Sequence, residues 1–394
     1  MSVSRRSFLK GMAAAAGAVV GTRIAGSGFI GEAKADAEQP ALVMIFLDGG
    51  YNALFGSAGG LVGSFGVDNG NMMDLGNGLI VDAPTFGTLP ASARSRMATI
   101  GVAHGITDHD ERQMMKWWSN GTRSYPLMLA NALGGDAAIK AAVVGDGMPS
   151  GPRPAEGTVT LQTIRDMDAT IAAIGGAAND PRVPARGIAG SALERSSAMS
   201  KTALDGNVRS LRSLREAYPT ATAVLKKPVK PFSFADLSTA YGLNGQTSVD
   251  GFAGQMAAAE LMITTGTNVV VAFDGGGWDS HGDVDGSAVR TMMSGRILPA
   301  LRTFLTRMFA DTTKNVVVAI AGDFARSLPG SDHNPNCAVT VMGKHVKVGT
   351  TGRVNANVEM AAGTPDVPQL WSYLASTLKV SNNPFGANPH ALVL

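Results

Sequence analysis

The chain has one cysteine, Cys337, and few charged residues for its length of 394 residues. A single thiol cannot form an intrachain disulfide or a cysteine-based zinc cluster, so both kinds of scaffold are excluded. Only 16% of the residues are charged and 45% are hydrophobic, which excludes an intrinsically disordered chain. The 49 glycines and 19 prolines would interrupt a long heptad pattern, which excludes a coiled coil. A chain of this length can still bury a sizeable hydrophobic core.

Residues 1–35 have the features of a twin-arginine export signal. Arg5 and Arg6 precede a short apolar, glycine-rich stretch over 11–20, and Ala33-Lys34-Ala35 has the small-x-small pattern of a cleavage site. The apolar stretch is too short to span a membrane, and no later run approaches 18 apolar residues. We therefore expect export of the folded chain by the twin-arginine machinery to the periplasm or the medium. The mature chain should begin near Asp36 and should contain no membrane span.

The leader also carries the basic charge of the chain. It has five basic side chains and one acidic side chain, so its removal changes the formal net charge from +2 to −2. A mature protein with a slightly negative charge lacks the basic surface that nucleic-acid binding requires. We expect no nucleic-acid partner.

Three continuous hydrophobic runs of strand length end close to acidic residues. They cover residues 41–47, 268–273 and 315–321. Because the runs do not alternate with polar residues, they indicate strands that are buried on both faces, as in a parallel sheet covered by helices. Weaker strands are expected at 97–102, 141–144, 158–161 and 338–342.

Helical periodicity appears between these strands, at 193–218, 251–264 and 297–308. The order of elements predicts an α/β fold, with a mostly parallel central sheet flanked by helices on both faces. We expect one such domain over residues 36–394. Residues 182–243 are expected to form a helical insert, either a lid over a site or a packed peripheral segment.

The acidic residues after the strands predict a polar site. In open parallel sheets, ligands bind beyond the carboxyl ends of the strands, where Asp48, Asp274 or Asp279, and Asp323 are expected. Three carboxylates there would repel one another unless a cation or strong donors lay among them. The alternative is that each aspartate caps a following helix.

Histidines occur in the same kind of loop. His281 follows Asp279 in a glycine-rich segment, His333 lies in a polar loop, and His109 precedes an aromatic segment. Each could be a metal ligand, a general acid or base, or a surface residue. His104, by contrast, is expected to be a core residue at the end of a strand.

Several common catalytic motifs are missing from the sequence. No P-loop, no Gly-x-Ser-x-Gly elbow after a strand and no His-Glu-x-x-His helix is present, and Gly49-Gly50 after the first strand lacks the Gly-x-Gly-x-x-Gly arrangement of a dinucleotide loop. These absences argue against a P-loop NTPase, an α/β-hydrolase, a dinucleotide-binding enzyme and a zincin protease.

The ordered set of motifs resembles a large bacterial family of exported proteins of unknown function, related to the alkaline phosphatase and sulfatase superfamily. The motifs are the twin-arginine leader, the double glycine after the first strand, Gly276-Gly277-Trp278-Asp279-Ser280-His281, and the segment from Asp323-Phe324-Ala325-Arg326 to Ser331-Asp332-His333. The resemblance covers most of residues 40–380. It implies an α/β fold with a metal site at the carboxyl ends of the central strands.

The resemblance also implies roles for individual residues. The implied metal ligands are Asp48, Asp279, His281, Asp323 and His333, of which Asp48 matches by position only. Arg326 would hold an oxyanion, as a guanidinium does through two parallel hydrogen bonds. Thr107, Asp108 and His109 lie in the turn where the family places further catalytic groups.

This sequence departs from the superfamily at three points. Asp279 and His281 are two residues apart, whereas phosphatases of the superfamily usually space this pair by four. Phe324 occupies the position of a ligand histidine. Thr107 is the only hydroxyl-bearing residue in the turn before His109, and Asp108 would be an unusual nucleophile. One metal ion, or none, is therefore expected rather than two, and the ion would be zinc, calcium or magnesium.

Two functions from different classes follow. The first is a metal-dependent hydrolase that acts on small anionic phosphate or sulfate esters, with a divalent ion that polarises the ester oxygen. The second is a non-catalytic periplasmic or cell-surface binding protein that keeps the fold with a degenerate site. Retention of the Asp and His set favours the enzyme, whereas the missing nucleophile and Phe324 favour the binding protein.

Overall fold

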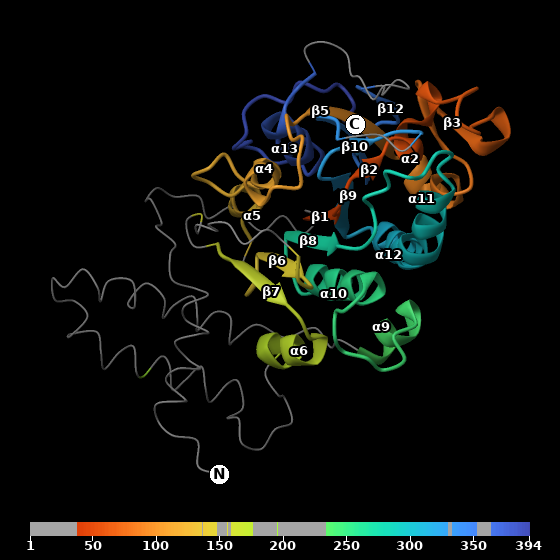
Figure 1. Ribbon diagram of the computed structural model, residues 1–394. Helices are drawn as coiled ribbons and strands as arrows, with labels where there is room; N and C mark the ends of the chain where they lie inside the picture. Colours follow the sequence, from red (N-terminus) through yellow and green to blue (C-terminus); the bar gives the residue numbers. More distant parts are fainter. Residues whose placement is uncertain are drawn as a thin grey trace.

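The structure is a computed structural model and describes residues 38–135, 137–147, 156, 159–175, 195, 234–329, 333–352 and 364–394 (Figure 1). The expected leader over 1–35 and the expected helix over 193–218, apart from residue 195, lie outside the described residues. The same is true of most of the expected insert over 182–243, of which helix α9 (Phe234–Tyr241) is described.

A central eight-stranded sheet has the strand order β12-β5-β11-β9-β1-β8-β6-β7. Strand β11 runs antiparallel to its neighbours β9 and β5, and every other pair in the sheet is parallel. The expected α/β class with a mostly parallel sheet is confirmed. The strands are β1 (Gln39–Leu47), β5 (Met97–Ala103), β6 (Ala141–Val144), β7 (Leu161–Ile164), β8 (Val269–Asp274), β9 (Lys314–Gly322), β11 (Asn336–Gly343) and β12 (Gly349–Thr350).

The three hydrophobic runs form adjacent strands in the middle of this sheet. β1 pairs with β8 on one side and with β9 on the other, and residues 41–47 of β1 are all 0% exposed. Burial on both faces explains why these runs contain no polar alternation. The strand expected at 158–161 is displaced: β7 begins at Leu161, because the backbone of Val159 pairs with Glu156 in an isolated bridge.

Helices cover both faces of the sheet (Figure 1). α10 (Phe252–Thr264) and α12 (Leu298–Ala310) pack on one face, and α5 (Tyr125–Leu133) and α13 (Val367–Thr377) on the other. The helices expected at 251–264 and 297–308 are confirmed. No helix in the described part of the chain has the length and apolar character needed to cross a membrane. The remaining elements that bear on the site are β2 (Tyr51–Asn52), α4 (Glu111–Met114), α11 (Ser287–Met292) and β10 (Ala325–Arg326).

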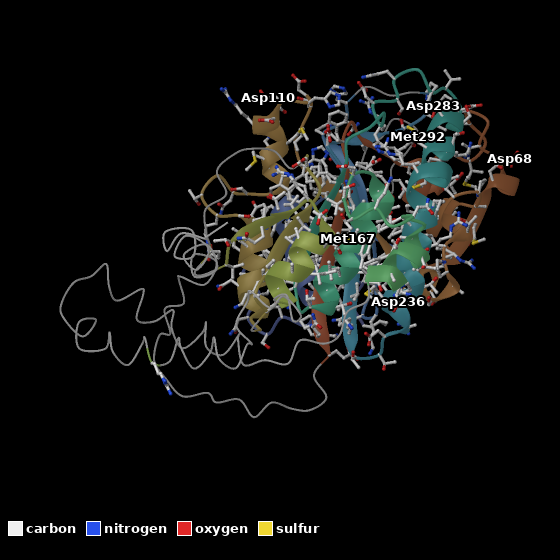
Figure 2. All side chains as sticks on the ribbon, turned by 90° about the horizontal axis from the view of Figure 1, so that it is seen from below. Asp68, Asp110, Met167, Asp236, Asp283 and Met292 are labelled. Atoms are coloured by element: carbon white, nitrogen blue, oxygen red, sulfur yellow. The ribbon has the colours of Figure 1, made fainter. Side chains whose placement is uncertain are left out.

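The direction of the strands determines which loops meet. The carboxyl ends of β1, β5, β8 and β9 lie at one edge of the sheet, and the amino end of the antiparallel β11 lies at that same edge. In Figure 2 the loop residues Asp110 and Asp283 lie at the same end of the molecule, whereas Asp236 of α9 lies toward the other end. The segments after β5 and β8 approach each other, since Nε2 of His109 lies 3.8 Å from Oδ2 of Asp279.

The histidine that follows β5 belongs to the core, as expected. His104 is 5% exposed, its Nδ1 accepts a hydrogen bond from the backbone N–H of Ile106 (2.9 Å), and its ring lies 5.2 Å from the ring of Trp117. Burial lowers the pKa of His104 to about 3. The ring therefore stays neutral in the folded protein at pH values where an unfolded histidine binds a proton.

Replacing His104 with asparagine should remove part of the acid sensitivity of the protein. The unfolded chain binds a proton at this position near pH 6.5 and the folded chain only near pH 3, so stability falls as the pH falls through this window. Asparagine keeps the acceptor for the N–H two residues on but does not titrate. Urea unfolding at pH 7 and pH 5 should show a wild-type loss larger by about 2 kcal/mol than that of His104→Asn. Equal losses in both proteins would contradict this assignment.

Candidate functional site

Five segments bring polar side chains to the carboxyl edge of the sheet. Asp48 follows β1, Asp323 follows β9, and Asp279 and His281 lie in the loop after β8. The turn after β5 carries Thr107, Asp108 and His109, and His333 lies just before β11. Residues more than 200 positions apart in the sequence are thus neighbours in the fold.

Asp48 and Asp323 lie next to each other because of the strand register. Leu47 pairs with Gly322 at the ends of β1 and β9, so the next residue on each strand is one of these aspartates. Asp323 is 0% exposed. Burial, followed by the charge of Asp323, raises the pKa of Asp48. The pair places concentrated negative charge at the base of the site.

The double glycine after β1 gives the site its close packing. Gly49 has φ +110°, and a Cβ at this position would lie 2.5 Å from the backbone nitrogen of Asp279. Gly50 has φ +126°, and a Cβ there would lie 2.7 Å from Nε of Arg326. Both positions therefore require glycine for conformation and for space. The pair lets the loop of Asp279 and the side chain of Arg326 approach the end of β1.

Arg326 is held from several sides. It lies in β10, which pairs in parallel with β2 directly beyond the ends of β9 and β1. Its side chain is 0% exposed, its Nε donates to the carbonyl of Gly49 (2.6 Å), and its guanidinium forms an ion pair with Asp279. These contacts favour a role for Arg326 in positioning Asp279. Binding of a substrate oxyanion would require the guanidinium to be uncovered.

Two histidines at this edge are each fixed through the same ring atom. Nδ1 of His109 lies 2.8 Å from Oδ2 of Asp323. Nδ1 of His333 donates to the backbone carbonyl of Thr107 (3.0 Å), since a carbonyl oxygen only accepts. A neutral histidine whose Nδ1 carries the proton has its lone pair on Nε2. Anchoring of Nδ1 to a carboxylate or a carbonyl is also the usual arrangement of a metal-binding histidine.

Possible ligand atoms of both histidines lie near Asp279. Nε2 of His109 lies 3.8 Å from Oδ2 of Asp279, and the possible ligand atoms of His109, Asp279 and His333 lie within 4.8 Å of one another. Nε2 of His333 is buried and has no hydrogen-bond partner among the described residues. Ligands of a tetrahedral zinc ion, each about 2.0–2.2 Å from the metal, stand about 3.5 Å apart. Side-chain shifts of about 1 Å would bring the three groups to that spacing, so their chemistry and placement fit a divalent cation.

His281 lies at the rim of this group. Its Nε2 is 3.2 Å from Oδ1 of Asp279, its side chain is 46% exposed, and its ring centroid lies 5.2 Å from that of His333. The side chain is thus close to the possible ligands and open to solvent. This position suits either an additional ligand or a group that exchanges protons with the solvent.

Phe324 packs beneath the histidines. Its ring stacks on that of His333 with centroids 4.1 Å apart and an interplanar angle of 22°, and it lies 4.9 Å from the ring of His109. Cζ of Arg326 lies 5.1 Å from the ring centroid of Phe324. Phe324 therefore supports the orientation of both histidine rings.

Thr107 and Asp108 contribute differently from His109. Both residues are exposed, and it is the backbone carbonyl of Thr107 that contacts His333. Within the described part of the chain, no hydrogen bond or ion pair involves the hydroxyl of Thr107 or the carboxylate of Asp108. Their catalytic roles stay predictions.

Asp274, the alternative to Asp279 at the end of β8, has structural partners. Its buried carboxylate accepts a hydrogen bond from Nε1 of Trp278 (2.7 Å) and forms an ion pair with Arg296. Arg296 also donates to the carbonyl of Gly276 (2.9 Å). These contacts fix the turn that leads to Asp279, so Asp279 rather than Asp274 is the carboxylate presented to the site.

Sequence reasoning placed His109 among the catalytic groups and left open that it is a metal ligand; the structure brings its possible ligand atom near those of Asp279 and His333. Sequence reasoning missed that Asp323 contacts Nδ1 of His109. The sequence contained one indication that these two residues meet, because His109 and Asp323 each follow a strand within a few residues. The direction of β5 relative to β9, which decides whether these ends meet, is not visible in the sequence.

Comparisons with known proteins give limited matches. A protein-family model described as "Protein of unknown function (DUF1501)" matches residues 196–363, a range that includes Asp279, His281, Asp323, Arg326 and His333 but excludes Asp48 and His109. No curated protein matches the chain.

Two solved structures are similar to this chain at low sequence identity. They are the alkaline phosphatase from the Antarctic bacterium TAB5 and a histidine-to-glutamate mutant of TAB5 alkaline phosphatase with Mg bound. Their identities are 9% and 10% and their TM-scores 0.34 and 0.36; each match covers 88% of this chain and 100% of the other chain. The family model and not these structures gives the conclusion: over residues 196–363 the chain is similar to a family of unknown function.

Proposed function

We propose that this protein is a hydrolase of phosphate or sulfate esters that depends on one divalent cation. The observation that supports the proposal most directly is the pair of histidines held through Nδ1. His109 and His333 come from separate segments, and the possible ligand atoms of both lie within 4.8 Å of those of Asp279. These three residues would hold the cation.

The other side chains of the site would position these ligands. Asp323 keeps the ring of His109 in one orientation, and Arg326 keeps the carboxylate of Asp279 beside the double glycine. A divalent cation held by these residues would supply positive charge that polarises an ester oxygen and lowers the pKa of bound water toward about 7. His281, half-exposed beside Asp279, is placed to move a proton between the site and the solvent.

The absence of a hydroxyl nucleophile from this group favours the second candidate, a binding protein that holds a cation without turnover. Among the described residues, no serine or threonine hydroxyl contacts Asp279, His109 or His333. A hydrolase built from these residues would therefore use water as the nucleophile. Both proposed functions require a bound cation, but only the hydrolase turns over an ester.

The deciding experiment combines metal analysis with an ester assay on the full chain purified without chelator. We expect about one bound divalent ion per chain and turnover of 4-nitrophenyl phosphate or sulfate, with turnover reduced more than about 100-fold in Asp279→Asn because a ligand is lost. Asp146→Asn, in an exposed ion pair with Arg165, is the matched control and should retain turnover. Bound metal without turnover would support the binding protein, whereas absence of both would refute the proposal.

We also propose that residues 1–35 direct export of the folded chain. The proposal depends on the paired arginines Arg5 and Arg6 in the sequence. Replacement of both by lysine should retain the protein in the cytoplasm, because the twin-arginine pathway recognises the guanidinium pair. Cell fractionation measures the distribution, and Arg23→Lys in the same leader is the control. Unchanged export of the double variant would contradict the proposed route.

A further inference from the structure

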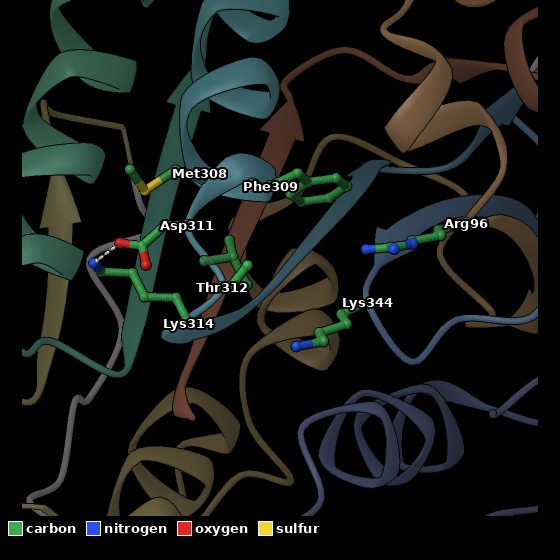
Figure 3. Close-up of a pocket in the computed structure, with 8 residues that line it drawn as sticks. Arg96, Met308, Phe309, Asp311, Thr312, Lys314 and Lys344 are labelled. Atoms are coloured by element: carbon green, nitrogen blue, oxygen red, sulfur yellow. Dashed lines mark hydrogen bonds and ion pairs between the residues drawn. The ribbon is translucent and has the colours of Figure 1, made fainter. Parts of the chain in front are cut away.

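Figure 3 shows a cavity of about 110 Å³. It lies at the opposite edge of the sheet from the proposed metal site. Arg96 precedes β5, Lys314 begins β9, and Lys344 follows β11. Asp323 follows the other end of β9, so the length of that strand separates the two places by about 30 Å. The cavity is therefore independent of the site described above.

The walls of the cavity differ in chemistry. Met308, Phe309 and Val316 form an apolar side, with Met308 and Val316 almost fully buried. Arg96 and Lys344 lie together on another side (Figure 3). A ligand that fills this space would meet both hydrocarbon and positive charge.

Two of the three cations around the cavity have anionic partners. Lys314 forms an ion pair with Asp311, and Lys344 forms one with Glu38. Burial works against ionisation of Asp311, but hydrogen bonds from Lys314 and Thr313 outweigh it and lower the pKa of Asp311 to about 2. Asp311 therefore stays ionised and balances the charge of Lys314.

Arg96 is the third cation, and it takes part in neither of these ion pairs. Arg96 is half-buried, and its guanidinium forms no hydrogen bond or ion pair within the described part of the chain. A guanidinium presents five N–H donors in a planar fork that matches a carboxylate. The charges around the cavity therefore sum to one positive charge, located on the group best suited to bind an anion.

We infer that this cavity binds a small organic anion, a short-chain carboxylate whose carboxyl group pairs with Arg96 and whose hydrocarbon part packs against Phe309 and Met308. A single water occupies about 10–15 Å³ measured with a probe of its own size, and a dry cavity of about 150 Å³ takes up benzene. A cavity of about 110 Å³ thus suits a ligand the size of butyrate. Lys344 lies on the same side, with its charge balanced by Glu38.

The test measures butyrate binding to the full chain by calorimetry or ligand-observed NMR. The protein carries Asp279→Asn and is treated with chelator, so that the proposed metal site does not bind the carboxylate. We expect Arg96→Gln to raise the Kd for butyrate at least 10-fold, because a two-point charged interaction is lost. Arg112→Gln, an exposed arginine on α4, is the matched control and should leave the Kd unchanged within twofold.

Further variants and ligands distinguish this inference from its alternatives. Arg96→Lys keeps the charge without the fork and should raise the Kd about threefold, which provides a result even if Arg96→Gln does not fold. Phe309→Ala should weaken binding of butyrate more than binding of acetate. The inference is overturned if Arg96→Gln binds butyrate like the wild type, if butylamine binds as tightly as butyrate, or if inorganic phosphate binds more tightly than butyrate.

Discussion

Replacing His333 with glutamine should lower the affinity for a divalent cation more than about 100-fold, since changes in residues that only support a metal ligand already cost 10–100-fold. Nε2 of His333 is buried without a hydrogen-bond partner among the described residues, and its Nδ1 is fixed by the carbonyl of Thr107. The ring is thus held in place, and a possible ligand atom of His333 lies within 4.8 Å of those of His109 and Asp279. Glutamine keeps the polarity of the side chain but does not place an sp² nitrogen lone pair at this position.

Zinc titration of the full chain, followed by calorimetry and by thermal unfolding, measures this effect. A cation at 100 times its Kd should stabilise the wild type by about 2.7 kcal/mol, and the same concentration should leave the melting temperature of His333→Gln nearly unchanged. His345→Gln is the matched control, because Nε2 of His345 lies 3.6 Å from Glu38, at the opposite edge of the sheet. Equal zinc affinity in His333→Gln and the wild type would exclude His333 as a ligand.

Asp323→Asn should give an intermediate result. The carboxylate of Asp323 contacts Nδ1 of His109 and lies beside Asp48, and it is fully buried. Asparagine can still accept a hydrogen bond from Nδ1 but lacks the negative charge that increases the basicity of the ring. A loss of about 10–100-fold in cation affinity is expected. A loss as large as that of His333→Gln would indicate that Asp323 binds the cation directly.

Replacing Arg326 with leucine should lower the free energy of unfolding by about 3 kcal/mol. The arginine side chain is 0% exposed, donates to the carbonyl of Gly49, and lies over the ring of Phe324. Leucine leaves the carbonyl without this donor and fills less of the space between β2 and β10. The loss arises from a buried hydrogen bond and from packing, and therefore does not require a bound cation.

Chemical unfolding of the metal-free protein tests this expectation. The control is Arg165→Leu, in which the lost partner is Asp146 and both side chains are 72% exposed. Exposed ion pairs contribute about 0–1 kcal/mol, so the control should differ little from the wild type. Similar stability losses in the two variants would show that Arg326 has no special structural role.

The amino-acid sequence by itself determined the fold class and the positions of the main strands. The runs over 41–47, 268–273 and 315–321 contain no polar residue after their first position, which is typical of strands in a sheet covered on both faces. Strand β7 is not formed by a continuous apolar run of this kind. Its short, mixed sequence leaves its boundaries to the register with β6, and the expected position was wrong by three residues at each end.

The sequence also identified the residue types of the candidate site, whereas only the tertiary structure decided how they are arranged. Asp279, His281, Asp323 and His333 were selected because they lie in polar loops and match the motifs of the resemblance. That His109 faces Asp279 depends on β5 running parallel to β9, with β11 antiparallel between them. The ion pair of Arg326 with Asp279 depends on the β2–β10 pairing. Strand order and direction result from packing between residues far apart in the chain, and a local sequence pattern contains no record of that packing.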